Sequence, residues 1–369
     1  MGKLDLRRIG LALAAPVLAI VVSLVITCLI LLAAGSSVSG FLSTIFSVPA
    51  ERNVINILNN ASILYLSGLA AAIGFRMNLF NIGVEGQYQV AVFTAAVFAA
   101  QGWLPGPLNV LVSIVLAMTA GALWASIAGL LKVTRGVSEV ISTIMLNAIA
   151  VSLTAYLLRQ VGVETGSNLA TQEIPQDSWV AGIPLLPGAP NELLGLALLA
   201  VLGGIAYAVL LNRSKFGFSL RATGTSASAA VASGIDVRRM VVVSLMISGA
   251  VAGLIGLPLL FGSSHSYGTT FQAGIGFAGI AVALLGRNNP IGIAFGALLF
   301  SYLTEQSNLL EINARVSPDI VAISQGVIVL AVVIAYEVVR RYRNALEQRQ
   351  VAAELSSSAP ADATPEATR

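Results

Sequence analysis

The chain has 369 residues, of which 56% are hydrophobic and 10% are charged, with a formal net charge of +3 and a mean hydropathy of +0.87. Soluble domains carry roughly 25% charged residues, so this composition excludes a soluble protein. The positive charges lie at the ends of apolar runs rather than in one patch, which excludes a nucleic-acid polymer as partner. The composition predicts an all-α, polytopic membrane helical bundle.

The N-terminus carries Lys3, Arg7 and Arg8 before a long apolar run, and no small-residue cleavage site is evident there. We interpret it as a retained membrane anchor rather than a cleaved signal peptide. The only cysteine, Cys28, lies in this run. An intrachain disulfide is therefore excluded, and the thiol is expected to pack as a small apolar group.

Ten spanning helices fit the charge-free stretches of the chain, since each helix needs about 20 apolar residues. Two stretches are long enough for two helices each, and they break at turn-like centres, at 102–107 and 262–266. The predicted spans are 11–34, 54–75, 82–101, 108–131, 139–158, 193–212, 240–261, 273–286, 290–305 and 319–338.

The distribution of Lys and Arg predicts the orientation. With both termini in the cytoplasm, 17 of the 20 basic residues fall on the inner side and only Arg52, Arg159 and Arg315 on the outer side. An odd number of spans would remove this bias. We therefore expect a membrane domain over 1–349, with an extracytoplasmic loop over 159–192. The Ala/Ser/Pro/Thr-rich segment 350–369 is predicted to be a disordered tail.

The first polar cluster at membrane depth lies between the second and third predicted spans. A carboxylate near the hydrocarbon is costly unless it faces a partner or water. Gly83 and Gly86 would permit a broken helix, and broken helices line substrate paths in transporters. The alternative is a cytoplasmic turn in which Glu85 pairs with Arg76. The predicted path residues here are Asn81, Glu85 and Gln87.

The second polar cluster lies at the start of the span 139–158. Residues three and four apart share a helix face, so four polar side chains are predicted to align there. They are either part of the same substrate path or interhelical hydrogen bonds that hold the bundle together. The residues are Glu139, Ser142, Thr143 and Asn147.

The longest basic, polar segment between spans is 212–239, with five Lys or Arg and a single acid, Asp236. Its Ala-rich part is predicted to form a short helix with Ser226 as N-cap and Gly234 as the C-terminal stop. A short capped helix between two spans suits docking of a soluble partner. An ordinary cytoplasmic loop is the alternative, because positive loops are expected on that side.

Other motifs do not predict chemistry. Gly274, Gly276 and Gly279 fit the dinucleotide fingerprint, but they lie in an apolar span and open no strand–helix unit. We expect them to allow close helix contact, as for Gly249/Gly253 and Gly292/Gly296. The sole histidine, His265, falls in a predicted outer loop and has no Cys or second His to make a metal site. No Walker A motif or catalytic set occurs, so ATP would be hydrolysed by another chain.

Three stretches resemble signature motifs of bacterial ABC-importer permeases of the branched-chain amino acid, ribose and nucleoside superfamily, and the nucleoside or simple-sugar branch is the most similar. They are FNIGVEGQ at 80–87, SEVISTIMLN at 138–147 and GIAVALLGRNNP at 279–290, and the likeness covers most of 54–338. The resemblance implies a ten-span fold of the vitamin B12-importer type (type II). It also implies that 221–235 is the coupling segment for the ATPase. Members often carry Asn-Pro where this chain has Ser226-Ala227, which makes the helix start less rigid. The predicted coupling residues are Arg221, Gly224, Ser226, Ala229, Ala230 and Gly234.

The resemblance implies a permease subunit in the bacterial inner membrane, without a cofactor or chemistry of its own. The expected partners are an ABC ATPase subunit that uses ATP, a paralogous permease or second copy, an extracytoplasmic solute-binding lipoprotein, and the surrounding lipid. Nucleosides are the expected solute, with simple sugars or branched-chain amino acids as alternatives. Two other classes of protein stay open. One is a secondary transporter with Glu85, Glu139 and Glu305 as ion-binding carboxylates, and the other is a non-transporting scaffold or receptor.

Overall fold

The computed structural model describes residues 21–33, 35–165, 168–269, 271–314, 317, 319–332 and isolated positions up to 348. The predicted tail 350–369 and the first half of the predicted span 11–34 lie outside the described residues. The chain divides into two compact units, Ser39–Val321 and a second made of Met1–Val38 with Ala322–Arg369. The elements that position the candidate sites belong to the first unit.

The regular structure of the described residues is helical except for one short hairpin and two isolated β-bridges. Strands β1 (Val163–Thr165) and β2 (Asn168–Ala170) pair antiparallel, with Glu164 opposite Leu169. The all-α prediction is therefore confirmed for the described residues. The α-helices are α2 (Val38–Ile45), α3 (Glu51–Arg76), α4 (Val84–Ala100), α5 (Gly106–Arg135), α6 (Glu139–Val161), α7 (Leu198–Arg213), α8 (Lys215–Thr225), α9 (Ala227–Ala232), α10 (Val237–Ala252), α11 (Leu257–Leu259), α12 (Ile275–Leu285) and α13 (Pro290–Ala314).

Helices occur at the described part of each predicted span. By length and composition, five are long and apolar enough to cross a membrane: Glu51–Arg76, Gly106–Arg135, Glu139–Val161, Gly195–Arg213 and Val237–Ser264. Shorter apolar helices cover Val21–Ala33, Ile275–Leu285 and Asp319–Val332. Both predicted breaks are present, since Gly102 turns the chain with φ +62° and His265 ends the helical run at Ser264 with φ +50°.

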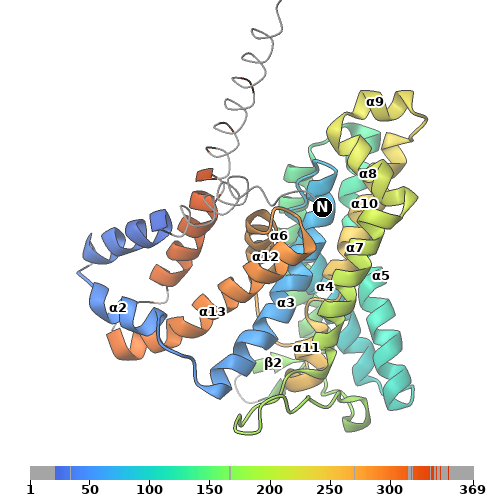
Figure 1. Ribbon diagram of the computed structural model, residues 1–369. Coiled ribbons are helices and arrows are strands. Elements are labelled where there is room, and N and C mark those ends of the chain that lie inside the picture. Colours follow the sequence, from blue (N-terminus) through green and yellow to red (C-terminus); the bar gives the residue numbers. More distant parts are fainter. Residues whose placement is uncertain are drawn as a thin grey trace, which may run out of the picture. The chain divides into compact units, whose positions relative to one another are not determined.

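Helix α3 forms the centre of the Ser39–Val321 unit (Figure 1). Its residues from Leu66 to Gly74 are all buried, because α7, α10, α12 and α13 cover it on different sides. A helix that is apolar all round is stable only inside a bundle. Small residues let the neighbours approach, and a Cβ on Gly279 of α12 would collide with the Ser67 side chain.

The backbones of helices α5 and α10 are in direct contact. A Cβ on Gly121 would collide with the Gly249 carbonyl, and one on Gly253 with Ala117. Gly276 faces the Glu85 backbone, and Gly292 faces Gly286. These contacts confirm the close helix contact predicted for the glycine spacings, since small interfacial residues are the usual means of packing spanning helices. The prediction is wrong for Gly274, which has no atom within 4 Å of a Cβ position and lies before α12 with φ +86°.

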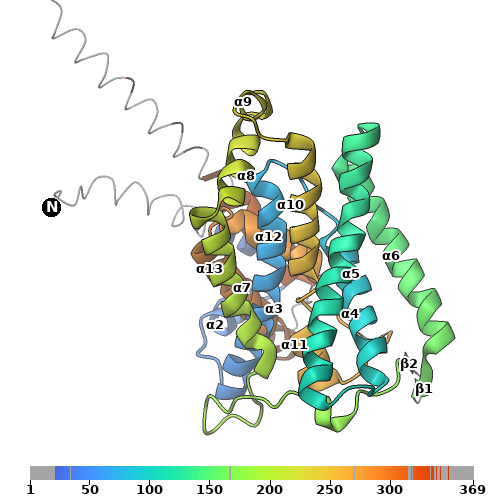
Figure 2. The same cartoon turned by 90° about the vertical axis from the view of Figure 1, so that its right-hand side faces the viewer.

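The unit has two distinct ends (Figure 2). Helix α9 caps one end, which we call the α9 end; the β1–β2 hairpin and the long segment before α7 form the other, the hairpin end. Tight bonds link the long segment to the chain after α10: Thr171 N donates to Tyr267 O at 2.7 Å and Ile174 N to His265 O at 2.8 Å. The basic residues of the α9 end are Arg76, Lys132, Arg135, Arg213, Lys215, Arg221, Arg238, Arg239 and Arg287.

His265 is packed at the hairpin end. Its ring stacks on Trp179, with centroids 3.8 Å apart and planes 10° apart. Its Nδ1 is buried and has no hydrogen-bond partner among the described residues. Burial lowers the pKa of the His265 imidazole, while the nearby Glu173 carboxylate acts weakly in the opposite direction. The residue therefore serves the packing of the loop in its neutral form.

Candidate functional site

After α3 the chain folds back along the helix instead of leaving the bundle. Leu79 N donates to Gly74 O at 3.0 Å, and Asn78 adopts φ +58°. Asn81 is thereby placed against α3 and is fully buried. Its Nδ2 donates to Ser248 Oγ on α10 at 2.8 Å, and Ser248 Oγ donates to Ala70 O at 2.6 Å. The fold-back thus links α3, α4 and α10.

This cluster lies deep in the bundle. Ser248 follows Val237, the first residue of α10, by eleven residues, which is ~16 Å at 1.5 Å per residue. Ala70 precedes Arg76, the last residue of α3, by six residues, or ~9 Å. With the ends of α3 and α10 at one surface of a hydrocarbon core about 30 Å thick, the contacts of Asn81 lie ~9–16 Å below that surface.

Glu85 holds the beginning of α12. Its carboxylate accepts hydrogen bonds from Gly274 N at 2.8 Å, Gly276 N at 2.7 Å and Gln89 Nε2 at 2.8 Å. The first N–H groups of a helix have no partner within the helix, and a negative charge there is favourable. A buried carboxylate, 3% exposed, is thus satisfied without a cation.

The alternative in which Glu85 pairs with Arg76 is wrong. Arg76 instead donates through Nε and Nη2 to the carbonyl oxygen of Asn288, at 3.1 and 2.8 Å. The Tyr207 hydroxyl donates to the same oxygen at 2.9 Å. Arg76 therefore ties the end of α3 to the turn after α12, while Glu85 faces the opposite end of α12.

Amide side chains complete the cluster. Asn147 on α6 donates to Ile82 O at 2.8 Å and accepts from Gly86 N at 2.9 Å. Gln87 and Asn81 exchange two hydrogen bonds of 3.0 and 3.1 Å. Because polar groups at this depth need partners, the amides satisfy a backbone that is not helical.

The remaining predicted path residues lie on the buried face of α6. Thr143 Oγ1 donates to Glu139 O at 2.7 Å, and Glu139 forms an ion pair with Lys132 in the last turn of α5. Ser142 Oγ is buried without a partner among the described residues. The predicted common face of Glu139, Ser142, Thr143 and Asn147 is confirmed, and it packs inside the bundle.

The structure therefore brings Asn81, Glu85, Gln87 and Asn147 together, with Thr143 beside them. Glu139 lies one helix turn before Thr143, where its carboxylate pairs with Lys132 and accepts a hydrogen bond from the Phe80 backbone, next to Asn81. Each of the predicted path residues is less than 10% exposed. The sequence showed the polar residues but not the partner of Glu85, since Gly274 is 189 residues away. Gly274 has φ +86°, which favours glycine, and this is the local signal that a turn begins α12.

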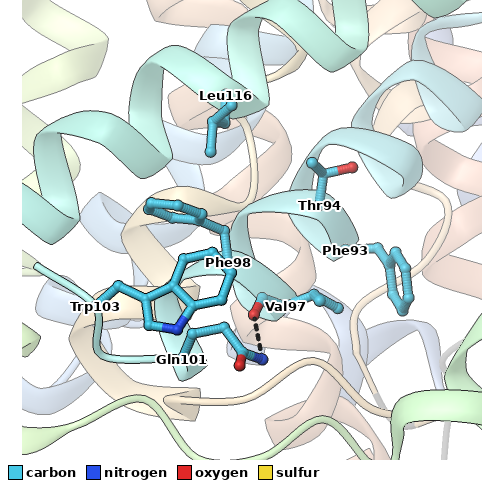
Figure 3. Close-up of a pocket in the computed structure, with 7 residues that line it drawn as sticks. All are labelled: Phe93, Thr94, Val97, Phe98, Gln101, Trp103 and Leu116. Carbon is cyan, nitrogen blue, oxygen red and sulfur yellow. Dashed lines mark hydrogen bonds between the residues drawn. The ribbon is translucent and has the colours of Figure 1, made fainter.

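An open apolar hollow of about 550 Å³ lies between α4 and α5 at the hairpin end (Figure 3). Phe98 and Trp103 meet edge to face there, at 6.0 Å. The polar groups are bonded within their own helix: Thr94 Oγ1 donates to Val90 O and Gln101 Nε2 to Val97 O. With an apolar lining and Trp103 73% exposed, the hollow suits a lipid chain below an interfacial aromatic residue.

Helix α9 has the predicted caps. Ser226 Oγ accepts from Ala229 N at 3.3 Å, and Gly234 has φ +79°. Ile235 N donates to Ala230 O at 3.0 Å and Gly234 N to Val231 O at 2.9 Å, which closes the helix end in the manner of a Schellman motif. The prediction of a short helix between Ser226 and Gly234 is confirmed.

One face of α9 is free for a partner. Ser228, Ala229 and Ala232 are exposed, and Val231 is 61% exposed, while Ala230 is buried. Small side chains with one apolar residue allow another backbone to approach closely. Four of the predicted coupling residues, Ser226, Ala229, Ala230 and Gly234, thus build the helix itself.

Arg221 and Gly224 lie on α8 and have a different position. The Arg221 guanidinium donates to the carbonyl oxygen of Leu211 on α7. A Cβ on Gly224 would collide with the Arg76 carbonyl and touch Met77. These two residues therefore attach the base of α9 to α7 and to the end of α3, rather than present a docking face.

A continuous series of contacts connects α9 with the buried cluster. Gly224 touches Met77, and Met77 Sδ accepts from Ser244 Oγ on α10 at 3.2 Å. One turn further along α10, Ser248 holds Asn81. A displacement of α8 and α9 can thus reach the cluster through packed groups.

Comparison with known proteins gives consistent matches. Residues 53–335 match a family described as branched-chain amino acid transport system / permease component. The chain is 34% identical to the guanosine ABC transporter permease protein NupP of Bacillus subtilis, over 88% of this chain and 93% of that protein. It is 28% identical to the nucleoside ABC transporter permease protein NupB of Lactococcus lactis, over 87% and 90%. It is 29% identical to the glucose ABC transporter permease protein TsgB13 of Haloferax volcanii, over 98% and 97%.

Proposed function

Because the chain belongs to the family of branched-chain amino acid transport system permease components, we propose that it is the membrane-spanning subunit of an ATP-driven importer of nucleosides. Two relatives that align over most of their length are named for guanosine and for nucleosides. The apolar helices of this chain, with their polar groups bonded inside the bundle, support a role in transport across the membrane.

Helix α9 supports the ATP-driven part of the proposal most directly. It is a short, doubly capped helix with a small-residue face, and it lies at the end of the unit that gathers the basic residues. Basic residues mark the cytoplasmic side, where ATP is present. The sequence has no Walker A motif, so a separate ABC ATPase subunit docks on α9 and hydrolyses the ATP.

The partners follow from this arrangement. The hairpin end faces outward and receives solute from an extracytoplasmic binding lipoprotein. A paralogous permease or a second copy completes the path, and each of the two permeases carries one ATPase. ATP binding shifts the pair between outward- and inward-open states by binding one state more tightly.

A secondary transporter is the less favoured class, for a structural reason. The secondary-transporter alternative predicts that Glu85, Glu139 and Glu305 bind ions near mid-membrane. The three candidates are instead apart: Glu85 caps α12, Glu139 pairs with Lys132, and Glu305 accepts from Asn56 Nδ2 at 2.9 Å. None of the three side chains is available for an ion together with the others.

Uptake of labelled guanosine by cells with and without the chain tests the solute. We expect uptake that depends on the chain and that unlabelled nucleosides compete for, whereas glucose and leucine in the same excess do not. Glucose is the second candidate, since the relative TsgB13 is named for it. Competition by glucose but not by nucleosides would contradict the proposed solute and favour that one.

A further inference from the structure

Residues 272–274, just before α12, have an exposed side and a fixed side. Gln272, Ala273 and Gly274 are exposed and not helical. Opposite that face, the Tyr88 hydroxyl donates to Gln272 O at 2.7 Å, and Glu85 accepts from Gly274 N. The segment is therefore held rigidly against α4, with one side of its backbone open.

In the proposed orientation, with the α9 end at the cytoplasmic surface, this open backbone lies near the middle of the membrane. Helix α12 has eleven residues, from Ile275 to Leu285, or ~16 Å. Its far end is tied to the end of α3 at the α9 end, because Arg76 donates to Asn288 O. Gly274 is therefore ~16 Å from that end, about half of the ~30 Å hydrocarbon core.

Backbone that is not helical cannot face lipid at this depth, because its polar groups would lose their hydrogen bonds. Such segments are found only where protein buries them or where they line a water-filled cavity. In the single chain the backbone here is exposed rather than buried, so this face is open to the path that the second permease completes. From this we infer that the solute path runs along the exposed side of residues 272–274 and that the Gln272 amide contacts the solute.

The chemistry of this side suits a neutral solute with a planar base, an assignment that rests on the proposed function. Gln272 has no side-chain hydrogen bond among the described residues, so its amide can offer both a donor and an acceptor. Phe277, on the first turn of α12, is 50% exposed and offers an aromatic face on which a base can stack. Ala273 and Gly274 add no charge, and nothing lies within 4 Å of where a Cβ on Gly274 would be.

The residues predicted from the sequence as path residues have another role in this account. Asn81, Glu85 and Asn147 have their hydrogen bonds inside the bundle. They hold the fold-back and the start of α12, and so fix the position of the segment that carries Gln272. They act as positioning residues, whereas Gln272 touches the solute.

Cysteine accessibility tests the path without knowledge of the solute. In a Cys28→Ala background, Gln272→Cys and the control Ile205→Cys are prepared as complete importer complexes in membranes. Ile205 is 58% exposed near the middle of α7 and faces apolar surroundings. We expect a charged, water-soluble methanethiosulfonate reagent to modify position 272 at least about tenfold faster, since thiols in lipid do not ionise. Equal slow rates at both positions would overturn the path.

Guanosine then tests the contact itself. Guanosine should slow modification at position 272, and Gln272→Ala should raise the half-saturating guanosine concentration about 2- to 10-fold through the loss of one hydrogen bond. Gln101→Ala, which changes an exposed glutamine at the hairpin end, should have no effect. Unchanged affinity in Gln272→Ala would overturn the contact. Absence of guanosine uptake by the unmodified complex would instead contradict the proposed function, while the modification rates still test the path.

Discussion

The start of α12 depends on the buried carboxylate of Glu85, which accepts hydrogen bonds from Gly274 N and Gly276 N. Glu85→Gln keeps the shape but places an amide N–H₂ near two backbone N–H donors, so at least one buried donor loses its acceptor. Each such loss costs about 1–3 kcal/mol. We therefore predict lower thermal stability and a lower protein level, measured by the melting of the detergent-solubilised protein.

A matched carboxylate serves as control for Glu85. Glu305→Gln removes a charge that accepts one hydrogen bond from Asn56 in a half-buried position, and an amide can still accept that bond. Its melting temperature should change little. If the melting temperature of Glu85→Gln equalled those of wild type and Glu305→Gln, Glu85 would not cap α12.

We predict that the stacking of His265 on Trp179 at the hairpin end depends on pH. Burial lowers the pKa of its imidazole in the folded protein, so the unfolded loop binds a proton more readily. The stacking on Trp179 is therefore fully stable above the ordinary histidine pKa of about 6.5 and weakens as the pH falls below it. We expect quenching of Trp179 fluorescence by acrylamide to increase between pH 7.5 and 5.

Two variants define that signal. Trp179→Phe identifies the contribution of this tryptophan. His265→Asn removes the titrating ring while tolerating the positive φ of the position, so its quenching should not depend on pH. A pH dependence that persisted in His265→Asn would assign the effect to another group.

For individual residues, the sequence predicted which polar side chains lie inside the bundle but not which groups they bind. Asn147 pairs with Gly86 across 61 positions and Glu85 with Gly274 across 189. Such pairs follow from the tertiary arrangement of helices, and no local spacing encodes them. The pairing of Glu85 with Arg76 looked plausible because the two are close in sequence, and the fold-back separates them.

Among the elements, α9 is the one on which coupling to ATP depends. Gly234→Pro replaces φ +79° by the proline value near −65° and so breaks the helix end. Ala229→Glu places a charge on the small-residue face. We predict that both variants insert at the wild-type level but lose ATP-dependent guanosine uptake.

The control for the α9 face is Ala229→Ser, which keeps a small side chain at the same exposed position. It should retain uptake close to wild type. Normal uptake by Ala229→Glu would show that this face does not contact the ATPase. If less Gly234→Pro protein were inserted, its loss of uptake would reflect a folding defect instead.

The sequence predicted the elements more accurately than the contacts. The charge-free stretches located the spanning helices, and the caps of α9 were readable from Ser226 and Gly234 because capping is local. The reason why α12 has only eleven residues was not readable. Its start is set by Glu85 on another helix, which is why the predicted span 273–286 includes two residues of the exposed segment before α12.

For the whole molecule, the basic residues of the α9 end predict the orientation. In a Cys28→Ala background, Ser228→Cys on α9 should react with an impermeant thiol reagent only after the membrane is opened. Gln176→Cys, exposed at the hairpin end, should react in intact cells. Ser178 is a poorer choice because it is buried and bonded to Asn109. The reverse labelling pattern would contradict the orientation.

The bundle as a whole follows from composition and period, whereas its specific arrangement does not. An all-α membrane bundle satisfies the backbone hydrogen bonds within each helix while so many apolar residues face lipid or one another. The vitamin B12-importer-like arrangement and the pairing with a second permease stay predictions.

The central claim is import of a nucleoside driven by ATP, and uptake of labelled guanosine by proteoliposomes tests it most directly. The vesicles contain the chain with its partner permease and ATPase, the binding protein on the hairpin side and ATP on the α9 side. We predict uptake that requires hydrolysable ATP and persists when ionophores remove all ion gradients. Uptake that proceeds without ATP and stops with ionophores would contradict the account.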